Sequence, residues 1–107
     1  MSKTIRFGTA VAAAILFAGV GAQAQSGGQA VYKMKCQSCH GAEGVPNPGI
    51  AKMMGVKPVT DPAVKAHSAA QMIAITANGK GKMPAFKSKL TDAQIKDSVD
   101  YFRSLMK

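Results

Sequence analysis

Both cysteines of the chain and one of its two histidines lie within the stretch Cys36-Gln37-Ser38-Cys39-His40. This cluster constrains the fold more than any other feature, because a disulfide between thiols so close in sequence would stabilise a fold very little. The chain has only 107 residues. A domain this small buries a marginal hydrophobic core and usually needs a further stabilising element. We therefore expect the cluster to supply that element.

The N-terminal segment predicts export. Two basic residues precede an apolar run over residues 7–20, and the small-x-small sequence Ala-Gln-Ala follows at 22–24. This order is typical of a secretory signal peptide. We predict a signal peptide over residues 1–24, cleaved after Ala24, and one domain over residues 25–107 in the periplasm. An uncleaved membrane anchor is the alternative, although the apolar run is at the lower limit of the length that spans a bilayer.

Three segments carry the signals of a helix start. Ser26, Ser68 and Thr91 are each followed three residues later by glutamine, which is the pattern of a capping box. The first helix would run into the cysteines, and the second would end at Asn78-Gly79. The third would carry one apolar stripe, formed by Ile95, Val99, Phe102 and Met106.

Glycine and proline are frequent over residues 41–62, which indicates a loop with room for one short helical piece at 50–54. No segment of the sequence shows the apolar–polar alternation of a β-strand. The sequence therefore predicts an all-α domain with three main helices and long loops.

Three kinds of chemistry use a Cys-x-x-Cys-His sequence. A redox dithiol requires a strand-to-helix turn, and this sequence predicts no strands. A structural zinc site requires four ligands, and only His67 remains as a distant one. Attachment of c-type haem fits best, because cysteines one helical turn apart can bond two vinyl groups while the next histidine reaches the iron. We predict one covalent haem c on Cys36 and Cys39, with His40 as an axial ligand, and keep the dithiol as the alternative.

A haem leaves a second axial position, for which Met83 is the best candidate. Met83 lies in the irregular loop "GKGKMPAF" between two predicted helices, far enough beyond His40 to reach the opposite haem face. His67 is the main rival. The other methionines of the domain are assigned to packing or to the attachment helix: Met34, Met53, Met54, Met72 and Met106.

With these residues the chain resembles class I cytochromes c, most closely the small monohaem bacterial and photosynthetic carriers. The resemblance covers residues 27–106. Gly28, Tyr32 and Cys36 match the glycine, aromatic and cysteine steps of the family's first helix. The Met83 loop matches "G-x-G-x-M-P-x-F", and residues 90–102 match the closing helix.

The resemblance implies a cytochrome c fold in which helices and loops wrap one covalent haem c. It also implies that a proline carbonyl accepts the second N–H of His40, for which Pro48 is preferred over Pro46. Tyr32 is expected to lie beside the haem site. Ser98 departs from the family pattern, because an aliphatic residue usually crosses the first helix at that position.

Basic residues exceed acidic ones, with a formal charge of +9. Such a charge favours an anionic partner, and nucleic acid is the weakest choice because no recognition motif is present. Six lysines flank the segments predicted to ligate haem, and we expect them to dock an acidic redox protein or membrane electron-transfer complex transiently: Lys33, Lys35, Lys80, Lys82, Lys87 and Lys89.

Histidine and methionine together would saturate the iron, so we predict outer-sphere electron transfer by a monomeric periplasmic carrier. This carrier is not an enzyme and takes no small-molecule substrate. Two alternatives remain: a haem-based sensor or weak peroxidase with a labile methionine, and a membrane-tethered subunit that donates electrons.

Overall fold

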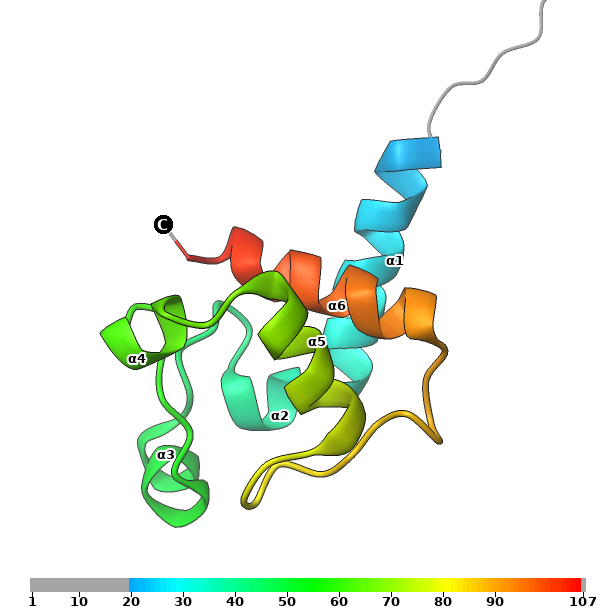
Figure 1. Cartoon of the computed structure of the whole chain (residues 1–107). Coiled ribbons are helices and arrows are strands. Elements are labelled where there is room, and N and C mark those ends of the chain that lie inside the picture. Colours follow the sequence, from blue (N-terminus) through cyan, green and yellow to red (C-terminus); the bar gives the residue numbers. More distant parts are fainter. Residues whose placement is uncertain (1–19, 107) are drawn as a thin grey trace, which may run out of the picture.

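The computed structural model of the chain describes residues 20–106 (Figure 1). These residues form six helices: α1 (Val20–Lys35), α2 (Gln37–His40), α3 (Pro48–Met54), α4 (Pro62–Lys65), α5 (Ala69–Asn78) and α6 (Asp92–Ser104). Within this part of the chain no strand is present, and the only β-type pairing is one isolated bridge between Lys80 and Met83. The predicted all-α class, with three main helices α1, α5 and α6, is confirmed.

The N-terminal helix α1 is longer than predicted. It begins at Val20, so Ser26 lies inside the helix and is not its cap. Alanine and glutamine before Ser26 are good helix formers, which explains why the helix extends upstream. Residues 1–19, which make up most of the predicted signal peptide, lie outside the described residues. Cleavage after Ala24 therefore stays a prediction.

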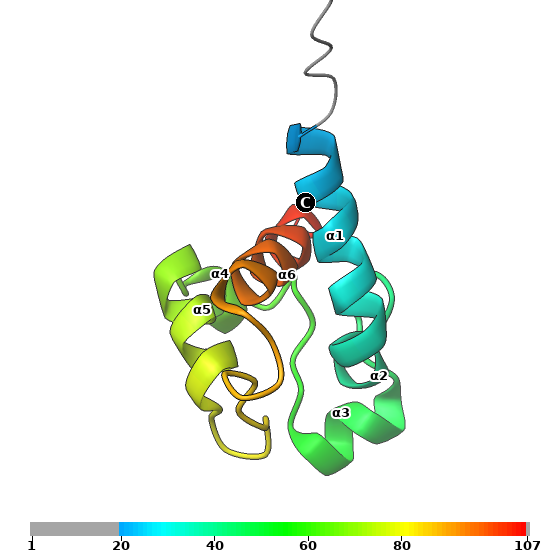
Figure 2. The same cartoon turned by 90° about the vertical axis from the view of Figure 1, so that its right-hand side faces the viewer.

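The helices α1 and α6 cross where Gly28 meets the backbone of Asp97. A Cβ added to Gly28 would collide with the carbonyl oxygen of Asp97, so only glycine lets the two backbones approach this closely. Both views place α6 across α1 at this level (Figures 1 and 2). Ser98, the departure from the family pattern, is buried beside this crossing and donates its hydroxyl to the Ile95 carbonyl at 2.8 Å. The buried hydroxyl is thus satisfied within its own helix.

Both predicted capping boxes of the later helices are confirmed. At the start of α5, the Gln71 amide donates to the Ser68 hydroxyl at 3.1 Å, and the Gln71 side chain accepts from the Ser68 amide at 2.8 Å. Thr91 and Gln94 make the same pair of bonds at the start of α6. These bonds satisfy amides that would otherwise have no partner at the helix start.

The loop over residues 41–62 contains the short helix α3, which was predicted, and the short helix α4 begins at its last residue. α3 starts at Pro48, two residues earlier than expected, because Asn47 caps it and proline suits a first helical position. α4 was missed, although Asp61 and Pro62 carry the same cap-then-proline signal.

The hydrophobic core lies between α1, α6 and the segment after α5. Its main buried cluster is formed by four side chains: Val31, Phe86, Leu90 and Ile95. Met83 is half-buried and packs against this cluster. The core thus joins the helix that precedes the cysteines to the loop that carries the predicted distal ligand.

Candidate functional site

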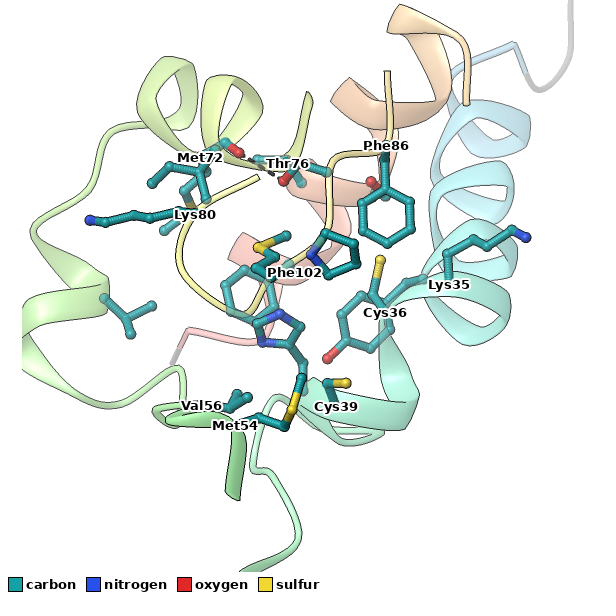
Figure 3. A pocket seen from close by; sticks show the side chains of 18 of the residues that line it. Lys35, Cys36, Cys39, Met54, Val56, Met72, Thr76, Lys80, Phe86 and Phe102 are labelled. Atoms are coloured by element: carbon teal, nitrogen blue, oxygen red, sulfur yellow. Dashed lines mark hydrogen bonds between the residues drawn. The ribbon is translucent and has the colours of Figure 1, made fainter. Parts of the chain in front are cut away.

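A cavity of about 400 Å³ brings together the residues that the sequence singled out. Cys36, Cys39 and His40 line it from the end of α1 and from α2, and Met83 lines it from the loop after α5. Figure 3 shows Cys36 and Cys39 on the same side of this cavity. Most of the remaining lining is apolar: Met54, Val56, Val64, Met72, Ile75, Phe86, Val99 and Phe102.

The turn of α2 places the three residues of the motif around one side of the cavity. The amides of Cys39 and His40 both donate to the Cys36 carbonyl, at 3.2 and 3.0 Å, which fixes them one helical turn further on. The turn ends at Gly41, whose φ of +83° few other residues adopt. The Tyr32 hydroxyl donates to the Gly41 carbonyl at 2.6 Å and so ties the end of the motif to α1.

Tyr32 is one of the most buried side chains of the described residues, with 1% of its surface exposed. Its ring lies 5.1 Å from that of Tyr101 and 6.1 Å from that of Phe102, measured between centroids. Burial, together with the nearby Cys36 and Tyr101, raises the pKa of Tyr32 above its usual value. Its hydroxyl therefore stays protonated and available as a donor to Gly41.

The imidazole of His40 is largely buried and its edge faces Phe102, with ring centroids 5.3 Å apart. Burial lowers the pKa of His40, because the charged form loses hydration. Among residues 20–106 its Nδ1 atom has no hydrogen-bond partner. A neutral imidazole that lines the cavity fits the role of an iron ligand.

The hydrogen bond expected from His40 to the Pro48 carbonyl stays a prediction. Among the described residues the Nδ1 atom of His40 has no partner, and Pro48 is exposed in the first turn of α3. Pro46 is the buried one of the two prolines.

The thiols do not have the properties of a redox dithiol. Cys36 and Cys39 are both free, and burial, with a smaller effect of the adjacent Cys39, raises the pKa of Cys36 to about 11. Catalytic dithiols instead have a lowered thiol pKa. Zinc also lacks support, because the described part of the chain contains no group of three or more His, Cys, Asp or Glu residues that could hold a metal ion.

The loop carrying Met83 is held in place by backbone hydrogen bonds. The amide and carbonyl of Met83 pair with those of Lys80, at 3.0 and 3.1 Å, and close a tight turn. Gly79 and Gly81 make this turn possible with positive φ angles of +78° and +58°. The Phe86 amide then donates to the Thr76 carbonyl at 3.0 Å, which fastens the end of the loop to α5.

The rival ligand His67 also lines the cavity, from the turn between α4 and α5. Its backbone carbonyl accepts from the Arg103 guanidinium at 3.0 Å. The same guanidinium nitrogen lies 3.8 Å from the sulfur of Met72, which lines the cavity too. Arg103 and Met72 thus lie at the site, although the sequence analysis did not single out Arg103 and assigned Met72 to packing.

The predicted docking lysines separate into two groups, although all six are exposed. Lys35, Lys80 and Lys82 line the cavity, as does Lys57, which the sequence analysis missed. The remaining ones, Lys33, Lys87 and Lys89, do not line it. Lys57 directly follows the segment Met54-Gly55-Val56, which also lines the cavity. This segment is distant in sequence from the cysteines and from Met83, so only the folded chain brings Lys57 to the site.

The arrangement fits a covalently bound haem. Two free thiols one helical turn apart, a buried neutral imidazole and a mostly apolar cavity match what haem c attachment requires.

Comparisons with known proteins agree with this geometry. Residues 23–102 match the family described as cytochrome c oxidase, cbb3-type, subunit III. The chain is 36% identical over 83 residues to cytochrome c6 from Leptolyngbya boryana, covering 75% of this chain and 89% of the relative. This chain is a member of the c-type cytochrome family.

A solved structure also resembles this cytochrome. The c-type cytochrome KustC0563 superposes with a TM-score of 0.67 at 29% identity, covering 75% of this chain and 98% of that one. The cytochrome therefore has the all-α cytochrome c fold and carries a covalently bound haem c, as the sequence predicted.

Proposed function

We propose that this cytochrome is a periplasmic electron carrier whose haem is attached to Cys36 and Cys39 and ligated by His40 and Met83. The similarity to cytochrome c6 supports the general function, which is electron transfer by a haem c protein. The residue assignments rest on one observation. Both thiols, the buried imidazole and Met83 line the same cavity, and two separate backbone networks hold them there.

The axial ligands determine what the site can do. His40 would coordinate iron without competition from a proton, because burial keeps its imidazole neutral. With Met83 as the second ligand, the iron would have no coordination position open for oxygen or a substrate. When bound, the haem supplies a one-electron couple, whose potential is higher with a thioether ligand than with a second imidazole. The protein thus acts as a carrier and not as an enzyme.

Met83 is preferred over His67 because backbone hydrogen bonds and core packing hold the Met83 loop in place. Met83 sits in a tight turn that is bonded to α5 and packed against the core, so its position is defined before it meets iron. A defined ligand position keeps the structural change between the two redox states small. Such preorganisation favours fast electron transfer.

A redox titration followed by visible spectroscopy tests this proposal. We expect a single one-electron transition and, in the oxidised protein, the far-red absorption band that methionine–iron ligation produces. Absence of that band would overturn the assignment of Met83. Fast binding of carbon monoxide to the reduced protein would instead support a labile methionine, as in a sensor or peroxidase, which the comparisons do not favour.

The partner is proposed to be an acidic redox protein or membrane complex. The lysines at the cavity, Lys35, Lys57, Lys80 and Lys82, support this proposal, because a positive rim steers an acidic surface toward the site. We expect the rate of electron transfer to an acidic partner to fall as salt is added. A rate that does not change with ionic strength would contradict electrostatic docking.

Export and cleavage after Ala24 are proposed from the N-terminal sequence pattern. In the described residues, no helix combines the length and the apolar character that a membrane crossing needs. Mass spectrometry of the protein isolated from periplasm tests the cleavage, which should leave Gln25 at the N-terminus. Retention of the first 24 residues would indicate an anchored protein.

A further inference from the structure

One lysine of the predicted docking group is already bonded within the protein. The ammonium of Lys82 donates to the backbone carbonyl of Met53 at 2.6 Å, across 29 residues of sequence. Lys82 precedes Met83, and Met53 belongs to the last turn of α3. The bond therefore joins the loop of the proposed distal ligand to a helix on another part of the chain.

The Met53 carbonyl is well suited to bind a cation. Carbonyls in the last turn of a helix lack amide donors from their own helix. The partial negative charge at a helix C-terminus also favours a positively charged group. The Met53 side chain itself is 61% exposed, so the backbone and not the thioether makes the connection to Lys82.

The bond lies at the cavity. Met54 and Gly55 line the cavity on the α3 side, directly after Met53, and Lys82 lines it beside Met83. Both views place the loop after α5 next to α3 (Figures 1 and 2). Opening the Met83 loop away from the cavity would require this bond to break.

We propose that Lys82 is a positioning residue that clamps the Met83 loop to α3 and so limits loss of the thioether from iron. The inference rests on the proposed ligand Met83 and adds a specific role for Lys82. It separates Lys82 from the other lysines at the cavity, which would act on a partner. Segments with few buried contacts open locally most readily, so one bond across the cavity adds to the backbone bonds that hold this loop.

The chain offers a matched control in the same turn. Lys80 is also exposed, also lines the cavity and carries the same charge. Among the described residues its side chain makes no hydrogen bond or ion pair, whereas its backbone closes the turn to Met83. Lys80→Leu and Lys82→Leu therefore remove the same charge without adding a thioether, and only the second removes the clamp.

The test compares holoproteins carrying Lys82→Leu, Lys80→Leu and Lys82→Arg. Imidazole binding to the oxidised protein, which requires the methionine to leave iron, is followed by stopped flow. We expect Lys82→Leu to bind imidazole about threefold to fivefold faster than wild type, as for loss of one exposed charged hydrogen bond. Lys80→Leu is expected to match wild type, and Lys82→Arg, which retains a donor, to stay close to it.

Hydrogen exchange of the Met83 amide gives a second measurement that does not depend on iron ligation. Exchange should accelerate in Lys82→Leu, which loses the bond to the Met53 carbonyl. It should not accelerate in Lys80→Leu, because the Met83 amide donates to the backbone of Lys80 and not to its side chain. Equal exchange and equal imidazole rates in the two variants would overturn the clamp. A wild-type protein without the far-red band would instead overturn Met83 as the ligand, whatever the exchange data show.

Discussion

The two sides of the cavity are built in different ways. On the attachment side, Cys36, Cys39 and His40 follow one another in a single helical turn that α1 and a buried tyrosine support. On the opposite side, Met83 sits in a loop held by a few backbone bonds and one exposed lysine. The first side is local in sequence, and the second is assembled from distant segments. We therefore expect the attachment side to govern folding and the loop side to govern ligand exchange.

Removal of both thiols should have the largest effect. The double variant Cys36→Ser, Cys39→Ser cannot hold haem covalently. Without haem, the small hydrophobic core would surround a cavity of about 400 Å³ that is lined by mostly apolar side chains. We expect this variant to be largely unfolded, as measured by circular dichroism and thermal melting. A helical variant that melts cooperatively would show that the attachment side folds without haem.

Replacement of Met83 should change the iron site while the fold persists. Met83→Ala is expected to lose the far-red band, to bind carbon monoxide rapidly when reduced and to have a lower reduction potential. Met53→Ala is the matched control, because that side chain is 61% exposed and lies outside the cavity lining. A far-red band that survives in Met83→Ala would assign the ligand to another methionine of the cavity, with Met72 next in line.

The crossing of α1 and α6 tests how much the attachment side depends on close packing. Gly28→Ala places a methyl group against the Asp97 backbone, so we expect a loss of about 1–3 kcal/mol in the free energy of unfolding. Gly27→Ala meets no atom within 4 Å and should stabilise the same helix by about 0.5–1 kcal/mol. Chemical denaturation of the holoproteins measures both. Equal changes in the free energy of unfolding for the two variants would contradict the close approach of α1 and α6 at Gly28.

Loss of the Tyr32 hydroxyl should have the smallest effect. Tyr32→Phe keeps the buried ring and removes only the bond to the Gly41 carbonyl, so we expect a loss of about 1 kcal/mol in the free energy of unfolding. The rate of imidazole binding should stay at the wild-type value, because the bond supports the attachment side and not the Met83 loop. Faster imidazole binding in this variant would show that the two sides are coupled.

Much of the fold could be predicted because its signals are local. The two capping boxes at Ser68 and Thr91 and the glycine stop after Asn78 were each visible within a few residues and are present in the structure. The predicted start of α1 at Ser26 was wrong, because good helix formers upstream of Ser26 extend the helix to Val20. α4 was missed, because its four residues are too few for a helical period to be recognised.

The sequence alone dictates the attachment chemistry, since two thiols and an imidazole within five residues occupy one helical turn in almost any helical fold. It also dictates the three main helices, through caps and apolar periodicity. Only the tertiary structure decides that Pro48 is exposed while Pro46 is buried, that Lys57 and Arg103 lie near the site, and that Lys82 is bonded to α3. These features depend on segments that are distant in sequence, and packing brings such segments together without leaving a local pattern.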